Sequence, residues 1–302
     1  MTRRPVLALL AAAVLAAGCT GGGASPSADA AGPIPGGLLD VVTKAGEIRV
    51  STDPQYPPQS ELKPDGSFEG FDIDVATEIA KRMGLEVKFE TPSWDTITAG
   101  SWSGRWDLSV GSMTITSPRE EVVAFSTPYY YTPAQMAAST ASGITSLDGL
   151  SGKTICVGEA TTYLDWLNGT LDFGSASPTT KPPEGATATT LSTDRLCAEA
   201  WMAGREDFEG WLSSSTTVDA AIEEGLPLVK VGDPVFSEPL AAAADKSGAD
   251  PTDFIAEVNE ILGEFHPDFA ALRRYLVENG FLDRADDDNT WVYWRSGGTF
   301  DV

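Results

Sequence analysis

An alternation of strand and helix runs through the chain twice, and it limits the fold more than any other sequence feature. The first run begins with a predicted strand at residues 47–51 and a helix over 70–84, whose apolar side chains recur at helical spacing. The second begins with a strand at 153–158 and a helix at 161–167. No Gly/Pro-rich linker separates the runs, so we predict two α/β lobes joined by strands. Ligands of such folds bind between the domains or beyond the carboxyl ends of the strands.

The charge balance excludes several classes of partner. Lys and Arg number 20 against 44 Asp and Glu, which gives a net charge of −24. Phosphate backbones would repel such a chain, so we expect no nucleic-acid partner. A bare anionic membrane surface would repel it as well. The chain has 1 His and 3 Cys, which is little material for a metal site, and we predict neither a metal nor a cofactor.

The first residues have the pattern of an export signal. Two arginines precede an apolar run over residues 6–18, which is too short to span a bilayer but has the length of a signal-peptide core. The run ends in Leu-Ala-Ala-Gly before Cys19, and this ending resembles a bacterial lipobox. We therefore predict a signal peptide over 1–18, lipidation of Cys19, and a flexible Gly/Pro-rich tether over 19–37. The protein would sit on the outer face of the cell membrane, held there only by its lipid; the alternative is an ordinary signal peptide cleaved nearby.

The two remaining cysteines are predicted to form a disulfide. Cys156 and Cys197 make an even count in a chain that is exported, and disulfides persist outside the cytoplasm. A bridge between them would close a loop of about 41 residues and contribute roughly 4 kcal/mol on the chain-entropy model. The alternative is two buried free thiols.

Several short motifs follow one another over some ninety residues. They are Asp53-Pro-Gln-Tyr-Pro-Pro58, Gly70-Phe-Asp-Ile-Asp-Val-Ala76, Gly111-Ser-Met-Thr-Ile-Thr-Ser-Pro-Arg119 and Phe125-Ser-Thr-Pro-Tyr-Tyr130. Through these motifs the chain resembles the extracellular solute-binding proteins of polar amino-acid ABC transporters, family 3. The second lobe carries a thinner likeness, through a Leu-Asp-Gly-Leu-Ser-Gly-Lys stretch and a Gly-Glu-Ala-Thr-Thr turn.

The resemblance implies a type II periplasmic-binding-protein fold, with two α/β lobes and a two-strand hinge that closes over a small ligand. Lobe 1 would take residues 38–137 and 240–302, and lobe 2 would take 138–239. We also predict helices over 251–264 and 268–279. The implied partners are a small-molecule ligand, an amino acid or a related carboxylate, and the permease subunits of an ABC importer. We expect a monomer and no enzymatic activity.

The family's carboxylate-binding arginine falls on Arg119. A planar guanidinium suits bidentate pairing with a ligand carboxylate. Its alternative role is a surface ion pair with Glu120 or Glu121. The same motif implies that Ser112, Met113 and Thr114 line the site through backbone groups and hydroxyls.

Further candidates come from both lobes. Thr161 and Thr162 follow a strand and begin a helix, where their N–H groups would bind a carboxylate or simply cap the helix. Tyr56 and Trp94 are candidates to sandwich the ligand side chain, although Trp94 has a core position as its alternative. Asp53 matches a family position that meets a polar side chain, or it is a turn residue before proline.

One departure from the family pattern concerns the ligand's ammonium group. The usual second-lobe aspartate falls on Leu212, Ser213 or Ser214, so no carboxylate stands there, and Ser213 is taken as the candidate. An unpaired buried ammonium is costly. Either Glu159 takes over, or the ligand is not an α-amino acid.

Two other functions remain open on the same fold, because a fold does not fix a function. One is an enzyme resembling cyclohexadienyl dehydratases, for which Glu159 is the candidate acid. The other is a sensory lipoprotein that binds a ligand without transporting it.

Overall fold

The computed structural model describes residues 32–174, 178, 180–265, 282–287 and 290–295. The predicted leader, Cys19, most of the predicted tether and the helix predicted over 268–279 lie outside these residues. The described residues from Pro33 onward belong to one unit. No helix within them is long and apolar enough to cross a membrane.

The first lobe is a parallel sheet with helices packed on it. Strand β1 pairs in parallel with both β5 and β6. Helix α2 buries Ile73, Ala76 and Ile79, which recur at helical spacing on the face that meets the sheet. The elements in chain order are α1 (Leu38–Ala45), β1 (Glu47–Ser51), α2 (Phe71–Arg82), β5 (Glu86–Glu90), α3 (Trp94–Thr98), β6 (Leu108–Thr114), α4 (Ser117–Val122), β7 (Val123–Phe125) and, after the second lobe, α8 (Thr252–Phe265).

A small three-stranded sheet adds to the first lobe. It consists of β2 (Gln55–Tyr56), β3 (Ser60–Leu62) and β4 (Phe68–Glu69), which pair in antiparallel order. Gly70 follows with φ 126°, a backbone conformation that glycine favours. A Cβ at this position would lie 2.3 Å from the carbonyl oxygen of Gln59, so the tight return from this sheet into α2 requires glycine.

The second lobe repeats the parallel arrangement. Strand β9 pairs in parallel with β10 and β11. A disulfide joins Cys156 in β9 to Cys197 in α6, as the cysteine count predicted. The elements in chain order are two 3₁₀ turns (Thr140–Ser142 and Leu147–Leu150), β9 (Thr154–Gly158), α5 (Thr162–Leu167), β10 (Thr187–Leu191), α6 (Arg195–Met202), β11 (Gly210–Ser214), α7 (Ser215–Glu223) and β12 (Leu228–Lys230).

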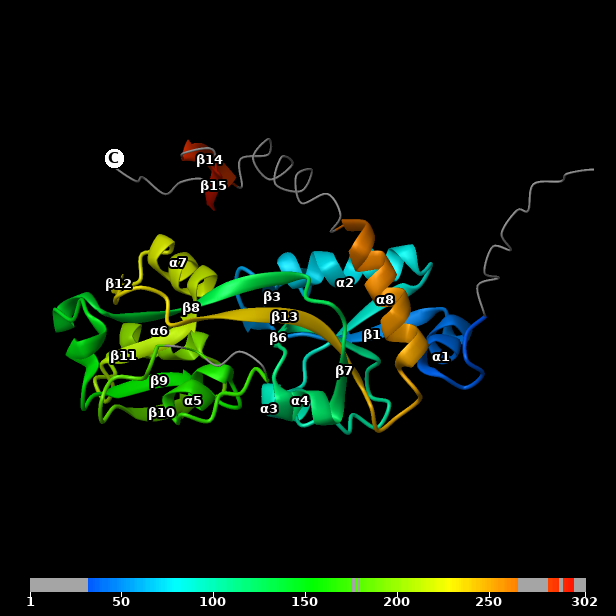
Figure 1. Ribbon diagram of the computed structural model, residues 1–302, viewed down its shortest axis with the longest axis horizontal. Helices are drawn as coiled ribbons and strands as arrows, with labels where there is room; N and C mark the ends of the chain where they lie inside the picture. The colour runs from blue at the N-terminus through cyan, green and yellow to red at the C-terminus, as the bar shows by residue number, and fades with distance from the viewer. Residues whose placement is uncertain (1–31, 175–177, 179, 266–281, 288–289, 296–302) are drawn as a thin grey trace, which may run out of the picture. The chain divides into compact units, whose positions relative to one another are not determined.

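Two long strands connect the lobes. β8 (Tyr130–Ser139) and β13 (Phe236–Asp245) pair in antiparallel register, and Figure 1 shows them running from one lobe to the other. They complete a ten-stranded sheet whose main path is β10-β9-β11-β8-β13-β6-β1-β5. The fold is therefore the predicted type II periplasmic-binding-protein fold with a two-strand hinge. The limits predicted for each lobe along the chain stay predictions.

Each lobe has its own hydrophobic core. Val50, Leu108 and Phe254 belong to the main core of the first lobe, and Ile155 and Trp211 belong to the two cores of the second. The parallel strands of both lobes end toward the region between these cores. Residues that follow β1, β5, β6, β9 and β10 therefore meet there, as expected for the carboxyl ends of strands in open α/β sheets.

The C-terminal part of the described chain contains a separate hairpin. β14 (Leu282–Asp287) and β15 (Thr290–Arg295) pair in antiparallel register and form a two-stranded sheet of their own. The sequence analysis assigned no structure to this stretch.

Candidate ligand-binding site

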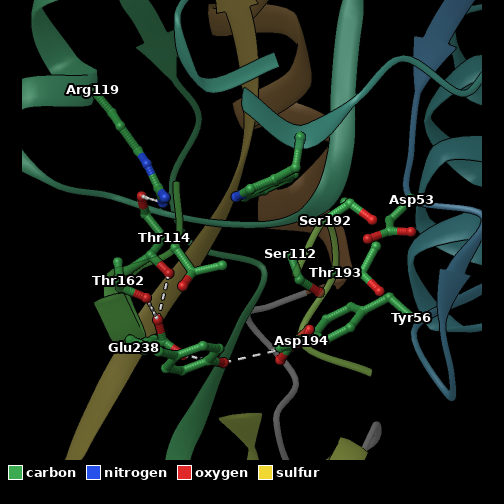
Figure 2. Close-up of a pocket in the computed structure, with 14 residues that line it drawn as sticks. Asp53, Tyr56, Ser112, Thr114, Arg119, Thr162, Ser192, Thr193, Asp194 and Glu238 are labelled. Carbon is green, nitrogen blue, oxygen red and sulfur yellow. Dashed lines mark hydrogen bonds between the residues drawn. The ribbon is translucent and has the colours of Figure 1, made fainter. Parts of the chain in front are cut away.

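A pocket lies where the carboxyl ends of the strands meet, and we call it the central pocket. It encloses about 40 Å³, which is room for a few water molecules. Figure 2 shows Arg119 and Glu238 on one side of it and Asp53 and Ser192 on the other. It is lined by Asp53, Tyr56, Trp94, Gly111, Ser112, Thr114, Arg119, Thr161, Thr162, Tyr163, Ser192, Thr193, Asp194 and Glu238.

Arg119 brings a buried positive charge to this pocket. The residue lies in the short helix α4 and is 7% exposed. Its Nη1 donates to the carbonyl of Thr114 at 3.0 Å, and its Nη2 donates across to the carbonyl of Ala160 in the second lobe at 2.9 Å. Burial lowers the pKa of Arg119, and the negative charge of Glu238 acts in the opposite direction. A guanidinium has five N–H donors, so these two carbonyls leave capacity for an anion.

The alternative predicted for Arg119 does not hold. Within the described part of the chain, no carboxylate lies within 4.0 Å of this guanidinium, so it forms no ion pair with Glu120 or Glu121. Its Cζ instead lies 5.6 Å from the centre of the Trp94 ring, within range of a cation–π contact.

Glu238 is a pocket carboxylate that the sequence analysis missed. It lies on the hinge strand β13 and is 2% exposed. It accepts hydrogen bonds from the hydroxyls of Thr114 (2.7 Å), Tyr163 (2.8 Å) and Thr162. Burial raises its pKa, while the three hydroxyl donors and Arg119 oppose that rise. The donors come from both lobes, so this carboxylate ties the lobes and the hinge together.

Asp194 is the second carboxylate that was missed, and it supplies an acid from the second lobe. It lies between β10 and α6, is buried, and accepts a hydrogen bond from the hydroxyl of Ser213. Burial raises the pKa of Asp194 to about 7, and the nearby charge of Asp53 adds to the rise. Gly158 permits this arrangement, because a Cβ there would lie 2.9 Å from the backbone nitrogen of Asp194.

The first lobe contributes Asp53, Tyr56 and Trp94. Asp53 is half-buried, accepts from the backbone N–H of Gln55 at 2.7 Å as a turn residue does, and still faces the pocket. Burial raises its pKa. The hydroxyls of Tyr56 and Tyr163 meet across the lobes at 3.5 Å, and the indole N–H of Trp94 donates to Ala160 at 3.2 Å.

Ser112 is held in the pocket wall by a buried network. Its backbone has φ 54°, a left-handed conformation that is unfavourable for a serine. Its hydroxyl donates to Asp72 at 2.8 Å, its N–H donates to the Tyr129 hydroxyl at 3.0 Å, and that hydroxyl donates to Asp72 at 2.8 Å. Burial raises the pKa of Asp72 to about 7. The network fixes a strained residue where the strand meets the cavity.

Thr161 and Thr162 combine the two roles that the sequence left open. The Thr161 hydroxyl accepts from the backbone N–H of Leu164 and donates to Gly158, so it caps α5. Thr162 is buried and donates its hydroxyl to Glu238. Both residues also line the pocket.

Three predicted site residues do not line the central pocket. Met113 lies between Ser112 and Thr114 on β6, and because side chains alternate along a strand it points into a core with Ile97. Glu159 follows β9 directly, is exposed and does not line the cavity. Ser213 is fully buried and donates its hydroxyl to Asp194, which lines the pocket.

The sequence as a whole matches one known family. A profile of the bacterial extracellular solute-binding proteins, family 3, covers residues 48–275. The chain belongs to this family. Among its relatives, the L-cystine-binding protein TcyJ of Escherichia coli (strain K12) is 34% identical over 133 residues, 43% of this chain and 50% of TcyJ. The lysine/arginine/ornithine-binding periplasmic protein of the same strain is 32% identical over 124 residues, 41% of this chain and 48% of that protein. This chain thus spans about half the length of these relatives.

Solved structures match over a larger part of the chain. The arginine-bound form of truncated ArgBP from T. maritima has a TM-score of 0.63 at 25% identity, covering 75% of this chain and 99% of that one. AncCDT-1, an ancestral amino acid-binding protein described as a precursor of cyclohexadienyl dehydratase, has a TM-score of 0.65 at 26% identity, covering 80% of this chain and 98% of that one.

The pocket of this family member contains more acid than base. Asp53, Asp194 and Glu238 face a single guanidinium, that of Arg119. Glu238 is satisfied by three hydroxyls, whereas Asp53 accepts from one backbone N–H, and Asp194 accepts from one hydroxyl and its own backbone N–H. A ligand that brings positive charge to Asp53 and Asp194 would relieve the repulsion between them.

Proposed function

We propose that this protein captures an α-amino acid for an ABC importer, and that the side chain of this amino acid carries a positive charge or an N–H donor. The observation that carries the proposal is that one pocket between the lobes is lined by both a buried guanidinium, Arg119, and a buried carboxylate, Asp194. Family membership and the relatives' names, which include cystine and basic amino acids, support it.

Each end of the ligand has a partner in this proposal. The carboxylate pairs with Arg119 and the N–H groups of Thr161 and Thr162. The α-ammonium pairs with Asp194, which takes the role that the missing family aspartate would have had. The side chain passes between Tyr56 and Trp94 and meets Asp53. Because these groups belong to both lobes, ligand binding stabilises the closed arrangement.

A ligand panel tests the proposal. The purified protein is titrated by calorimetry and thermal shift with the twenty common L-amino acids and L-ornithine. We expect L-lysine, L-arginine or L-ornithine to give saturable heat and a raised melting temperature, because a ligand that binds only the folded state stabilises it. Binding of neutral or acidic amino acids alone would exclude the basic class, and no binding at all would exclude amino-acid capture.

We also propose that Cys19 carries a lipid that holds the protein on the outer face of the cell membrane. The lipobox-like ending of the apolar run and the Gly/Pro-rich segment after it support this. Metabolic labelling with a fatty acid should mark the wild-type chain but not a Cys19→Ala variant. Cells that lack this protein should lose uptake of basic amino acids if it delivers ligand to permease subunits. Unchanged uptake would favour the sensory role instead.

An enzyme of the dehydratase type is the second candidate. The likeness to AncCDT-1 and the buried acid Glu238 favour it, whereas Glu159, the acid first considered, lies outside the pocket. Incubation with prephenate or arogenate decides: formation of an aromatic product that a Glu238→Gln variant does not form would support the enzyme, and no product would exclude it.

A further inference from the structure

A second cavity adjoins the central pocket, and we call it the outer pocket. It is partly open to the surface and has a volume of about 270 Å³, several times that of the central pocket. The two share Asp53, Trp94, Ser192 and Thr193, which we call the neck. The outer pocket is lined by these four residues and by Pro54, Thr91, Pro92, Ser93 and Ile97.

The neck residues differ in their position relative to the carboxylate-binding groups: Trp94 contacts the Arg119 guanidinium, whereas the other three lie across the central pocket. In Figure 2, Asp53, Ser192 and Thr193 lie on the side opposite Arg119 and Thr162. A ligand held by its carboxylate at Arg119 therefore directs its side chain toward the neck. The central pocket has room for a few water molecules only, so a long side chain continues through the neck into the outer pocket.

The outer pocket differs from the central pocket in chemistry. Asp53 is its single charged lining residue, and it stands at the neck. Beyond the neck the lining consists of two prolines, an isoleucine and two hydroxyl side chains. Such a surface suits an uncharged, partly apolar group, because burying a second charge there would leave it without a partner.

Building on the proposed function, we infer that the outer pocket is a binding subsite for the far end of an extended amino-acid substrate. The class of substrate is an α-amino acid whose side chain presents an N–H group to Asp53 and ends in an uncharged group within the outer pocket. Acylated or otherwise N-substituted basic amino acids belong to this class. The central pocket alone selects the amino-acid head group, and the outer pocket sets the tolerated length.

The test uses the full chain in detergent, with L-lysine, Nε-acetyl-L-lysine and Nε-dansyl-L-lysine as probes. Calorimetry measures the first two, and dansyl fluorescence follows the third. Thr91 lines the outer pocket but not the central one, so a Thr91→Trp variant adds bulk to the outer pocket, and Thr187→Trp, an exposed threonine on β10 outside both pockets, is the matched control.

We expect Nε-dansyl-L-lysine to bind the wild type and the Thr187→Trp control. Thr91→Trp should weaken dansyl-lysine binding at least tenfold and leave any L-lysine binding within about twofold. Binding of L-lysine without binding of either derivative would overturn the subsite while leaving the proposed function in place. Equal binding of the dansyl probe by Thr91→Trp and the control would also overturn it. Failure of all three probes would overturn the subsite, and the L-arginine and L-ornithine titrations then decide the basic amino-acid class separately.

Discussion

The first lobe brings a guanidinium to the central pocket, whereas the second lobe brings a carboxylate. Arg119 already donates to two carbonyl groups, one from each lobe, so its guanidinium is held in place before a ligand arrives. Asp194 accepts from the Ser213 hydroxyl and faces the negative charge of Asp53. The difference shows that the two lobes contribute unequally: one offers a prepared anion site, and the other holds a poorly compensated negative charge that a ligand cation would relieve.

The hinge strand β13 contributes a third buried charged group, Glu238, whose hydrogen bonding differs from that of Asp194. Glu238 is as deeply buried as Asp194, but hydroxyls from both lobes surround its carboxylate. A carboxylate with several donors needs no ligand to be stable, so we assign Glu238 to holding the lobes together and Asp194 to binding. Four experiments test these different roles of the two lobes and the hinge.

Replacing Arg119 should have the largest effect on affinity. Arg119→Ala removes one side of a buried charge pair, which costs about 2–5 kcal/mol, roughly a 30- to 4,000-fold weaker binding of the amino acid identified by the panel. Arg119→Lys should recover only part of the loss, because an ammonium lacks the planar fork. Arg205→Ala is the control, since Arg205 pairs with Asp207 at the surface. Unchanged calorimetric affinity in Arg119→Ala would contradict the prepared anion site.

Removing the disulfide tests the second lobe alone, because the first lobe contains no cysteine. The bridge closes a separation of 41 residues, and a double Cys156→Ser/Cys197→Ser variant should lose about 4 kcal/mol of unfolding free energy. Thermal unfolding measures the change. Because Cys197 lies one turn into the helix that Asp194 precedes, ligand affinity should fall too. A melting temperature equal to that of the wild type would show that the bridge does not support this lobe.

Most of the site residues that the sequence proposed for the first lobe lie within continuous motifs. Asp53, Tyr56 and Arg119 each stand in a short stretch with its own pattern, and each lines the pocket. Asp194 lies instead in a Ser-Thr-Asp loop before a helix, where an aspartate is usually interpreted as the N-cap of that helix. Its role depends on the close approach of Gly158 and on Ser213, contacts between segments far apart in the chain. The candidate Ser213 lies one hydrogen bond away from this carboxylate.

The elements of the fold that the sequence did not predict likewise lack a continuous local pattern. The parallel strands of both lobes and most helices follow from apolar spacing. The strands β2, β3 and β4 are two or three residues long, too short for any periodicity to be visible. Glu238 lies on β13 two residues before position 240, where the predicted return to lobe 1 begins, so the inward direction of its side chain could not be predicted.

Neutralising Asp194 should weaken binding less than the loss of Arg119. Asp194→Asn keeps the shape and removes the charge, and a hydrogen bond to a charged group contributes about 1.5–3 kcal/mol, so affinity should fall roughly 10- to 150-fold. At pH 8 the ligand-free variant should melt higher than the wild type, since a buried, poorly compensated charge is gone. Asp233→Asn, an exposed aspartate in the same lobe, is the control. If Asp194→Asn binds normally, the ammonium meets another group.

The smallest effect is the pH dependence of binding, which follows from the raised pKa of Asp194 at about 7. Below pH 7 this carboxyl gains a proton and cannot pair with an ammonium, so affinity should fall about tenfold between pH 8 and pH 6. The ligand-free protein should behave in the opposite way. A folded-state pKa above the unfolded value near 3.9 means that the folded state holds the extra proton between about pH 4 and pH 7, so stability falls as pH rises through this window.

Calorimetry and thermal unfolding from pH 5 to pH 8 measure both trends. Two variants, Asp194→Asn and Asp72→Asn, show which carboxyl group causes each trend. Asp53 and Glu238 also face the pocket with raised pKa values, and Asp72, with a pKa of about 7, lies behind Ser112. Asp194→Asn should flatten the pH profile of binding, whereas Asp72→Asn should flatten part of the stability profile and leave the binding profile intact. A binding profile that keeps its slope in Asp194→Asn would transfer the titration to Asp53 or Glu238 and remove the contrast between the lobes.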